Sequence, residues 1–585
     1  MNEAGMRLGH FSRALSVGAL LMAGSQIALA QAVSETNPES VTPTQAAFEA
    51  PAAPIVTLDM EALQSALAED ARDFSEAEQQ AIAEFYEARA GQPFWSAEDG
   101  VALRALTTAA GEAGAQGLPP ARYSLEALEA AGDNPVLQEL AAMRAYLQLG
   151  GDLTAGIVRP SRIDEEISIR PERATAETLL AALTDQSVTD ALRSLEPQDP
   201  DYRALMAEKA RLSALSEAEG LGAPVPSGPS LRMGESSPRV AALRARLERL
   251  GYNTDPVGAT TLLPVNDETT ESGTETTSIA DTSFDEGLDA ALKTFQRDQG
   301  LIDDGVAGRR TLAALNVSVA DRIRNIDVNL ERMRWMNIDL GARRIEVNIP
   351  DYSVEMIDDG DVVWSSRTVV GEVEETRTPE FSDEMTYFVV NPTWHIPDSI
   401  AMRDYLPQLR TDPQVLARKD MSLYTRSGVR IDPALVDFSQ YTSESFPFRV
   451  KQNPSAANAL GRVKFMFPNQ YSIYLHDTPS RQYFNRDHRA LSNGCIRLEK
   501  PLELAHVLLE GQVSDPVASF DGWLETKSER YVNLDRPVQV HLMYRTVFVD
   551  ADGKIRYRED IYGRDAKVFS ALEAQGVRLP DAAQG

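Results

Sequence analysis

A lone cysteine and a histidine shortly before it are the residues whose types and spacing suit covalent chemistry. Cys495 lies in the segment 492–498, which reads SNGCIRL, and His476 ends the run 471–476, which predicts a strand. The polar segment 477–491 between them predicts a loop. A thiol with an imidazole close upstream is the outline of a nucleophile and its general base. The glycine before the thiol lets the backbone turn closely, so that N–H groups near Gly494 and Cys495 can face a developing oxyanion.

The alternative for Cys495 is an inert core residue, which free cysteines usually are. Against it stands the charge of residues 480–500, where five Lys or Arg face two Asp or Glu, a local net charge of +3 in a chain of net charge −31. This setting suits a substrate that carries carboxylates, and it is expected to lower the pKa of the thiol. The five cations are Arg481, Arg486, Arg489, Arg497 and Lys500.

The group that orients His476 is the next question. Asp477 follows it directly, but neighbours on a strand point to opposite faces, so we expect a backbone carbonyl instead. Arg497 is open to two interpretations, binding of a substrate carboxylate or bracing of the loop, and we favour the first. The other histidines have no comparable context: His488 is expected at the surface, His395 in a structural role, and His506 and His541 have no supporting neighbours.

Composition excludes several classes of function. With 57 Lys and Arg against 88 Asp and Glu, the chain lacks the basic excess that nucleic-acid or anionic-membrane binding normally needs. One cysteine excludes an intramolecular disulfide, and the six scattered histidines form no His-x-x-x-His pair. We therefore expect no metal site and no cofactor.

The first 30 residues predict a secretory signal peptide, with Arg7 and Arg13 before an apolar stretch and Ala28-Leu29-Ala30 as a small-x-small cleavage site. An uncleaved anchor is the alternative, but the stretch is short and polar residues interrupt it. No later segment has 18 uninterrupted apolar residues, so the mature chain is expected to lack a transmembrane segment. Residues 31–57, rich in Ala, Pro, Thr, Ser and Glu, predict a disordered tether.

The chain has 585 residues, which is too long for one domain. Its patterns predict a multidomain α+β protein: helical periodicity of 3.6 comes first, and a period of two begins near Arg344. The predicted parts are a helical scaffold (58–222), a small helical module (230–318) with an acidic disordered insertion (253–283), a connecting helix (319–340), a β-rich catalytic domain (341–520) and a C-terminal extension with a β-hairpin (521–585).

Residues 393–445 interrupt the β-rich domain, and their own signals are helical at 398–409 and 412–418. We expect a capping subdomain, either a mobile lid over the site or a rigid decoration. In the lid interpretation Met402, Tyr405, Leu406 and Leu409 pack inward, and Arg403, Arg410 and Asp412 stay in solvent.

Two resemblances follow from these motifs. Met233-Gly234, the Val240/Leu243/Leu247 helix and Gly308-x-x-Thr311 resemble the peptidoglycan-binding module of bacterial wall enzymes, whose binding groove is either kept or decayed here. His476 with Ser492-x-Gly494-Cys495-Ile496-Arg497 resembles the YkuD-type L,D-transpeptidase signature, and Val369–Gly371 with Arg377-Thr378-Pro379 resembles its upstream strand and loop. The domain order is similar to that of the large YcbB-like subgroup. The segments Asn391–Ile400 and Asp560–Asp565 also resemble motifs of that subgroup.

The resemblance implies a periplasmic enzyme that cross-links peptidoglycan. Cys495 would form a thioester on the third residue of a tetrapeptide stem, with His476 as base, and Ser492, Asn493, Gly494 and Arg497 would form the oxyanion or substrate-binding group. Its partners would be peptidoglycan stem peptides and other wall-synthesis proteins. Many family members have histidine where this chain has Asn493, so any base role falls on His476. The alternatives are an L,D-carboxypeptidase or endopeptidase with the same site, and a non-catalytic wall-binding scaffold.

Overall fold

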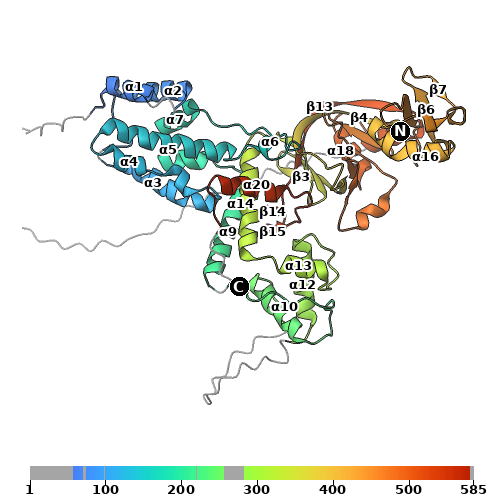
Figure 1. The fold of residues 1–585 in the computed structure, drawn as a ribbon, viewed down its shortest axis with the longest axis horizontal. Coiled ribbons are helices and arrows are strands. Elements are labelled where there is room, and N and C mark those ends of the chain that lie inside the picture. Colours follow the sequence, from blue (N-terminus) through green and yellow to red (C-terminus); the bar gives the residue numbers. More distant parts are fainter. Residues whose placement is uncertain (1–56, 70–73, 98, 219, 256–281, 580–585) are drawn as a thin grey trace, which may run out of the picture. The chain divides into compact units, whose positions relative to one another are not determined.

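The predicted signal peptide, the predicted tether except Thr57, and most of the acidic insertion lie outside the residues that the structure describes. Figure 1 shows the elements of the rest in chain order. Among these residues no helix is long and apolar enough to cross a membrane. The computed structural model describes residues 57–69, 74–97, 99–218, 220–255 and 282–579.

The predicted scaffold region is helical, and most of it packs around an apolar core that includes Leu106, Leu140 and Tyr146. The buried apolar residues of 202–212 belong to a separate core. The second helix of the region begins after Ser75, which forms a reciprocal capping box with Glu78. The helices are α1 (Met60–Glu69), α2 (Glu76–Ala88), α3 (Val101–Glu112), α4 (Glu126–Ala131), α5 (Pro135–Ala155), α6 (Pro160–Ile163), α7 (Ala176–Asp185), α8 (Val188–Leu195) and α9 (Pro200–Ala218), with the turns η1 (Ala113–Gln116) and η2 (Pro120–Tyr123).

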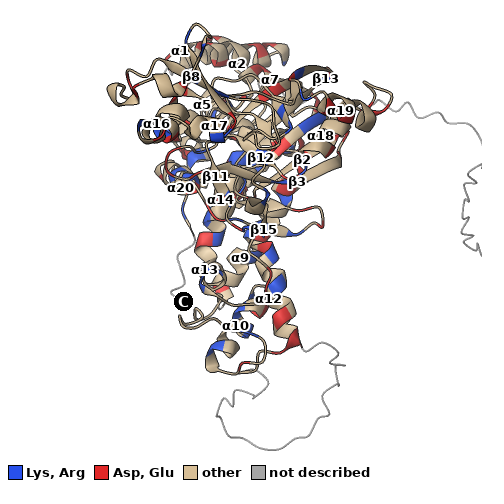
Figure 2. Ribbon diagram, turned by 90° about the vertical axis from the view of Figure 1, so that its right-hand side faces the viewer, with Lys and Arg blue, Asp and Glu red and all other residues tan. Residues whose placement is uncertain are grey.

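The small module consists of α10 (Pro238–Arg249), α12 (Glu286–Asp298) and α13 (Arg309–Leu315). The predicted core positions Val240, Leu243 and Leu247 are fully buried and pack against Phe295 and Leu315. Figure 2 shows basic and acidic residues of these helices lying close to one another, as a solvated face requires.

The predicted connecting helix is α14 (Val319–Trp335), and its apolar face is buried as expected. The helix is also buried on its polar side, which the prediction missed. Glu331 accepts hydrogen bonds from the N–H groups of Ile157 and Val158 at 2.7 and 2.8 Å, and Arg332 pairs with Glu380 and Asp565. Thus α14 joins the scaffold to the β-rich part through buried charged groups, which are stable only when paired.

The β-rich part is a nine-stranded sheet in the order β11-β3-β12-β10-β9-β4-β13-β1-β2. An additional pairing of β2 with β3 joins the two sides, so the sheet closes on itself. The strands are β1 (Arg343–Asn348), β2 (Ser353–Asp358), β3 (Asp361–Gly371), β4 (Phe381–Val390), β9 (Val463–Met466), β10 (Leu475–His476), β11 (Ala490–Ser492), β12 (Ile496–Leu498) and β13 (Arg530–Met543).

Strand β13 pairs with both β1 and β4, so the sheet of the predicted catalytic domain reaches past residue 520 into the predicted extension. The predicted hairpin is present as β14 (Val547–Val549) and β15 (Ile555–Tyr557). The helices of this region are α18 (Pro501–Leu509), α19 (Pro516–Glu525) and α20 (Arg564–Ala574), and the loop before β11 holds the turn η6 (Arg481–Asn485).

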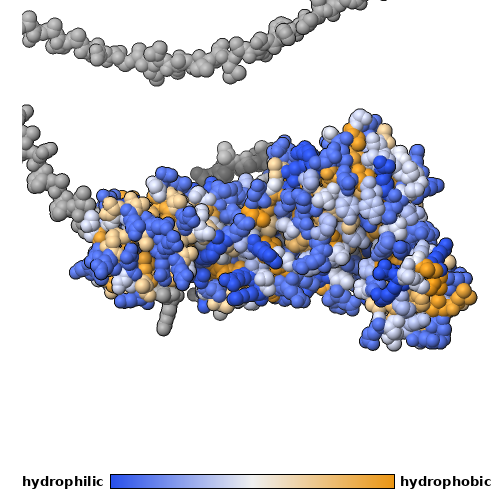
Figure 3. Space-filling model, turned by 90° about the horizontal axis from the view of Figure 1, so that it is seen from above, coloured by the Kyte–Doolittle hydropathy of each residue, from blue (hydrophilic) through white to orange (hydrophobic). Residues whose placement is uncertain are grey.

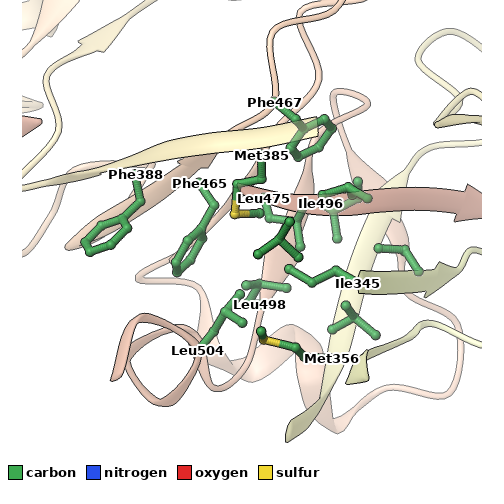
Figure 4. Close-up of a cluster of buried hydrophobic side chains, with 14 of the residues drawn as sticks. Ile345, Met356, Met385, Phe388, Phe465, Phe467, Leu475, Ile496, Leu498 and Leu504 are labelled. Carbon is green, nitrogen blue, oxygen red and sulfur yellow. The ribbon is translucent and has the colours of Figure 1, made fainter. Parts of the chain in front are cut away.

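The core of this sheet holds the strands that carry the predicted site. Figure 4 shows Phe465 from β9, Leu475 from β10 and Ile496 and Leu498 from β12 directed towards one another, together with Leu504 from α18. These side chains are fully buried, so the residues beside them in sequence have fixed positions.

The capping subdomain has its own core, which includes Leu406, Leu416, Leu423 and Phe448. Its helical stretch is as predicted, but it also contains the four-stranded sheet β5-β8-β6-β7, which the prediction missed because two of the strands have only two residues each. Its elements are β5 (Trp394–His395), α15 (Asp398–Ile400), η3 (Ala401–Tyr405, a π-helical turn), α16 (Leu406–Thr411), α17 (Val415–Arg418), β6 (Met421–Thr425), β7 (Arg430–Ile431), η4 (Pro433–Leu435), η5 (Phe438–Gln440) and β8 (Phe448–Gln452).

The predicted inward face of the subdomain, Met402, Tyr405, Leu406 and Leu409, packs into this local core. Figure 3 shows a largely hydrophilic face with separate hydrophobic patches. Within the described chain the most exposed large apolar side chain is Leu435 of the subdomain, at 84%.

Candidate active site

Parallel pairing of β10 with β12 brings the predicted nucleophile and base together. In the register of these strands Leu475 lies opposite Ile496 and His476 lies opposite Arg497. The N–H of Ile496 donates to the carbonyl of Tyr474 at 3.1 Å. Cys495, which directly precedes β12, therefore lies beside Tyr474, two residues before His476 and on the same face as it.

The predicted strand 471–476 is wrong over its first four residues. Only Leu475 and His476 are in β10, and Ser472 has a left-handed backbone with φ of +56°. This turn directs the carbonyl of Ser472 to the thiol of Cys495, which donates to it at 3.7 Å. The sequence does not predict this turn, since serine seldom adopts a left-handed backbone conformation.

Tyr474 is a site residue that sequence reasoning missed. Its hydroxyl forms hydrogen bonds with the Cys495 thiol and with Trp394 of the capping subdomain, and its ring lies 5.7 Å from that of His476. Burial, followed by the nearby thiol, raises the pKa of Tyr474 well above its usual value. The signal was its position two residues before His476, since alternate residues share a face.

The thiol itself is neutral in this environment. Burial raises the pKa of Cys495 to about 11, although hydrogen bonds from Tyr474 and the charges of Arg497 and Lys464 oppose this rise. The expectation that the local positive charge lowers this pKa is wrong, because desolvation outweighs it. Apart from Arg497, the cations of residues 480–500 have partners away from the thiol. Arg481 contacts Asp477 and the carbonyl of Glu499, and Arg486 lies over the ring of Tyr483. Arg489 donates to three backbone carbonyls, and Lys500 lies near Glu503.

His476 is buried and neutral, with one defined tautomer. Its Nδ1 lies 2.5 Å from the backbone carbonyl of Asp477, and because a carbonyl can only accept, Nδ1 carries the proton and Nε2 is left as the basic atom. Burial, together with the charges of Arg497 and Lys464, lowers the pKa of His476 to about 3. The Asp477 carboxylate instead accepts from the N–H groups of Arg462 and Thr478. The orienting group is therefore a backbone carbonyl, as expected.

These two pKa shifts predict how the thiol reacts with pH. A neutral thiol with a pKa of about 11 gains thiolate steadily as the pH rises, so we expect iodoacetamide to alkylate Cys495 about tenfold faster per pH unit between about pH 6 and 9. Alkylation rates measured by intact mass over this range test it. A rate that is flat across the range would instead indicate a thiolate–imidazolium pair at rest.

The loop before Cys495 is held in one conformation by its own groups. Ser492 Oγ donates to the carbonyl of Cys495 at 2.6 Å and accepts the N–H of Gly494 at 3.2 Å. Gly494 has φ of +101°, and a Cβ there would lie 3.1 Å from Ile473, so glycine fits this position best. The N–H of Gly494 is thus engaged, contrary to its predicted oxyanion role. No acceptor among the described residues takes the N–H of Cys495, which leaves that amide as the candidate oxyanion donor.

A second layer braces this loop. The Thr378 hydroxyl donates to the carbonyl of Gly494 at 2.7 Å and accepts the N–H of Gly371 at 2.9 Å, and Thr376 Oγ1 donates to the carbonyl of Ser492 at 2.9 Å. Tyr562 from the C-terminal region donates to the carbonyl of Gly371 at 2.6 Å. Gly371, Thr378 and Tyr562 belong to the motifs 369–371, 377–379 and 560–565, whereas Thr376 lies outside them, and only the fold reveals that they meet.

The predicted residue Asn493 contacts the capping subdomain. Its Oδ1 accepts from Nη2 of Arg403 at 2.6 Å, so Arg403 is not simply in solvent as expected. Arg403 also lies 3.8 Å from Glu375. Arg410 and Asp412 make contacts inside the subdomain, with Tyr441 and Arg418.

Four more histidines lie among the described residues, all away from this site. His395 is exposed in β5, and His488 packs on Tyr352. His506 packs on Phe520, and His541 is buried with ring contacts to Ser382 and Leu340. In the described part of the chain, His, Cys, Asp and Glu form no group of three or more that could hold a metal ion.

Three family models match parts of this chain. Residues 342–518 match the family model described as the L,D-transpeptidase catalytic domain (YkuD), residues 80–208 match the "Scaffold domain" and residues 236–315 match the "Putative peptidoglycan binding domain". The predicted resemblance to the YkuD-type L,D-transpeptidases and the predicted fold class are thus confirmed.

One curated relative is a Haemophilus influenzae protein named "Putative L,D-transpeptidase", 36% identical over 234 residues. The match covers 38% of this chain and 45% of the relative, so the chain spans less than half the length of that protein.

Solved structures similar to this chain include an L,D-transpeptidase of Xylanimonas cellulosilytica and a fused Zn-dependent amidase of Clostridium acetobutylicum. Their identities are 16% and 12% and their TM-scores 0.16 and 0.14. Each match covers 54% of this chain, with 99% and 100% of those chains. At these TM-scores neither carries a conclusion.

Proposed function

We propose that this chain, which carries a YkuD-type L,D-transpeptidase catalytic domain at residues 342–518, cross-links peptidoglycan in the periplasm through a thioester on Cys495. The observation that carries the proposal is the pairing of β10 with β12. It brings the lone thiol beside a buried histidine whose Nε2 is free to accept a proton.

In the first half-reaction the proton of the thiol passes to Nε2 of His476 as sulfur attacks the carbonyl carbon of the third stem residue. The oxyanion forms next to the N–H of Cys495. Collapse breaks the peptide bond, and the imidazolium gives its proton to the departing D-Ala amine. The Cys495 thiol and the His476 imidazole are both neutral at rest, so the stem binds to a site whose reacting groups carry no charge.

In the second half-reaction an amine of another stem attacks the thioester. His476 accepts the proton of that amine and returns one to sulfur as the C–S bond breaks, which regenerates the thiol. The exchange needs no external energy source, because a thioester is more reactive towards amines than the peptide bond that is formed.

Arg497 is assigned to substrate binding in this proposal. It is half-buried next to Cys495, its guanidinium lies 5.8 Å from the ring of Tyr483, and it has no ion pair among the described residues. A half-buried cation without an acid favours a carboxylate on the substrate. The match of residues 236–315 supports a wall polymer as that substrate.

Product analysis of the purified mature chain with tetrapeptide stems tests the function. Transfer gives cross-linked dimers, whereas water as acceptor gives tripeptide without dimers and would assign an L,D-carboxypeptidase. Binding to peptidoglycan without either product would leave a non-catalytic scaffold.

The capping subdomain is proposed to be a lid that protects the thioester from water. It reaches the site through Arg403 on Asn493 and Trp394 on Tyr474. Arg403→Ala is therefore expected to raise the ratio of hydrolysis to transfer several-fold, because water enters the loosened site. Arg410→Ala, which removes a contact inside the subdomain, is the matched control.

Equal ratios of hydrolysis to transfer for Arg403→Ala, Arg410→Ala and the unmodified chain would show that the subdomain is a rigid structural addition and not a lid. The structure extends the subdomain past the predicted end at residue 445, because β8 pairs with β5 and β6. Deletion of residues 393–452 is therefore expected to raise the same ratio further, provided that circular dichroism shows the rest of the chain folded. The separate core of the subdomain makes such a deletion feasible.

A further inference from the structure

A second cavity, of about 630 Å³, contains none of the residues that surround Cys495. Its walls come from α13, α14, the turn before β2, the loop before β11 and the hairpin β14–β15. Its lining residues include Arg310, Arg322, Tyr352, Arg489, Tyr557 and Glu559. A volume of this size is typical of small-ligand sites.

The cavity is positively charged in an acidic chain. Six arginines line it against four acids, Asp351, Asp487, Glu559 and Asp560. Four of the arginines already have acid partners: Arg310 pairs with Asp487 and Glu559, Arg558 with Asp351, Arg367 with Glu499, and Arg297 with Asp303. Among the described residues, Arg322 and Arg489 are the lining arginines left without an acid partner.

Arg322 is the least satisfied of them. It is 3% exposed, donates to the carbonyl of Ala314 at 3.0 Å and lies 5.1 Å from the ring of Tyr557, yet its Nε has no partner in the described residues. No acid among those residues forms an ion pair with it, and burial lowers its pKa. A buried guanidinium without a carboxylate is costly, and a bound anion would offset that cost.

Tyr352 and Arg489 give independent support. The hydroxyl of Tyr352 is buried without a hydrogen bond, and its backbone is left-handed with φ of +56°, a strain that marks functional positions. The guanidinium of Arg489 stacks 4.9 Å over the Tyr352 ring, bonds only to carbonyls and directly precedes β11, which leads to Ser492.

We propose that this cavity is an accessory site for a zwitterionic wall peptide, with carboxylate held by Arg322, Arg489 and Tyr352 and ammonium beside Glu559. The identity of the peptide rests on the proposed function. The acids of the cavity favour a ligand with both charges over a phosphate, which they would repel. Oε2 of Glu559 accepts from Arg310 at 3.2 Å, and the side chain is 69% exposed, so its other oxygen can take the ammonium.

Calorimetry with the full mature chain carrying Cys495→Ala tests the site, since this chain cannot turn the peptide over. The probe is the tetrapeptide stem that ends in diaminopimelate and D-Ala. We expect two binding events per chain, one in the catalytic cleft and one in the cavity. Arg322→Gln is expected to weaken the second about tenfold or more, and Tyr352→Phe several-fold, through loss of hydrogen bonds to a charged group.

Matched controls are Arg324→Gln, two residues along α14 and paired with Asp321, and Tyr531→Phe, an exposed tyrosine of β13. Both should leave the second event unchanged. Esterifying the carboxylates of the peptide should abolish it. Melting curves identify any variant that fails to fold, and Tyr352→Phe, which loses only an unpartnered hydroxyl, keeps the test valid if Arg322→Gln unfolds.

The proposal is overturned if folded Arg322→Gln and Tyr352→Phe bind the peptide as the parent does, or if inorganic phosphate fills the cavity and the peptide does not displace it. If the peptide binds in the cavity but not in the catalytic cleft, the proposed function is contradicted and the accessory site stands. If it binds in the cleft but not in the cavity, the accessory site is contradicted and the proposed function stands.

Discussion

Replacement of Cys495 by alanine or by serine is expected to abolish acyl-enzyme formation and cross-linking, with at least about a 10³-fold loss of rate. Alanine removes the nucleophile. Serine keeps the size, but a hydroxyl has a far higher pKa than a thiol, and burial already raises the pKa of the thiol to about 11. Product formation from tetrapeptide stems, measured by mass spectrometry, checks the result.

The fold should survive both substitutions. The Cys495 side chain makes one long hydrogen bond to a carbonyl, at 3.7 Å, and a contact with Tyr474, whereas the loop is braced by Thr378 and Ser492. A melting temperature within a few degrees of the parent is expected. Cross-linking retained by folded Cys495→Ala would remove the proposed mechanism.

Replacement of His476 by glutamine is expected to slow acylation by about 10²- to 10⁴-fold, the usual contribution of a general base. Glutamine can still donate towards the carbonyl of Asp477 but cannot accept a proton from the thiol. Alkylation of Cys495 by iodoacetamide should change much less, because burial, Tyr474, Arg497 and Lys464 set the pKa of the thiol.

This split between acylation and alkylation separates a base from a residue that only maintains structure. His506→Gln, on α18 against Phe520, is the matched control and should change neither rate. Equal losses of acylation and alkylation in His476→Gln would mean that the site had collapsed, and no loss of acylation would exclude His476 as the base.

The sequence was sufficient to predict that Cys495 and His476 come together and that helical parts precede a β-rich part. Both depend on short-range spacing: the motif around Cys495 and the helical repeats of Val240, Leu243 and Leu247 are visible without a fold. Capping at Ser75 is similarly local, because it depends on a residue three positions away.

What the sequence could not supply depends on burial and on long-range pairing. The pKa of Cys495 was predicted in the wrong direction, because charge can be counted along the chain but desolvation cannot. The left-handed turn at Ser472 and the place of β13 between β1 and β4 follow from tertiary packing. The short strands β5 and β7 lacked a readable alternation, so the sheet of the capping subdomain was missed.

Asn493 shows how the two kinds of information combine. The sequence indicates that this position carries no titratable group, and the structure shows its amide oxygen bonded to Arg403. Asn493 thus contacts the capping subdomain, and in the proposed mechanism proton transfer is assigned to His476.

The central claim is that Cys495 carries the acyl group. It is tested most directly by mixing the mature chain with tetrapeptide stem in the absence of an acceptor stem, quenching in acid and measuring intact and peptide masses. The account predicts an adduct of the tripeptide acyl group on Cys495 and one equivalent of D-Ala released for each adduct. An adduct on another residue, or D-Ala release undiminished in Cys495→Ala, would contradict it.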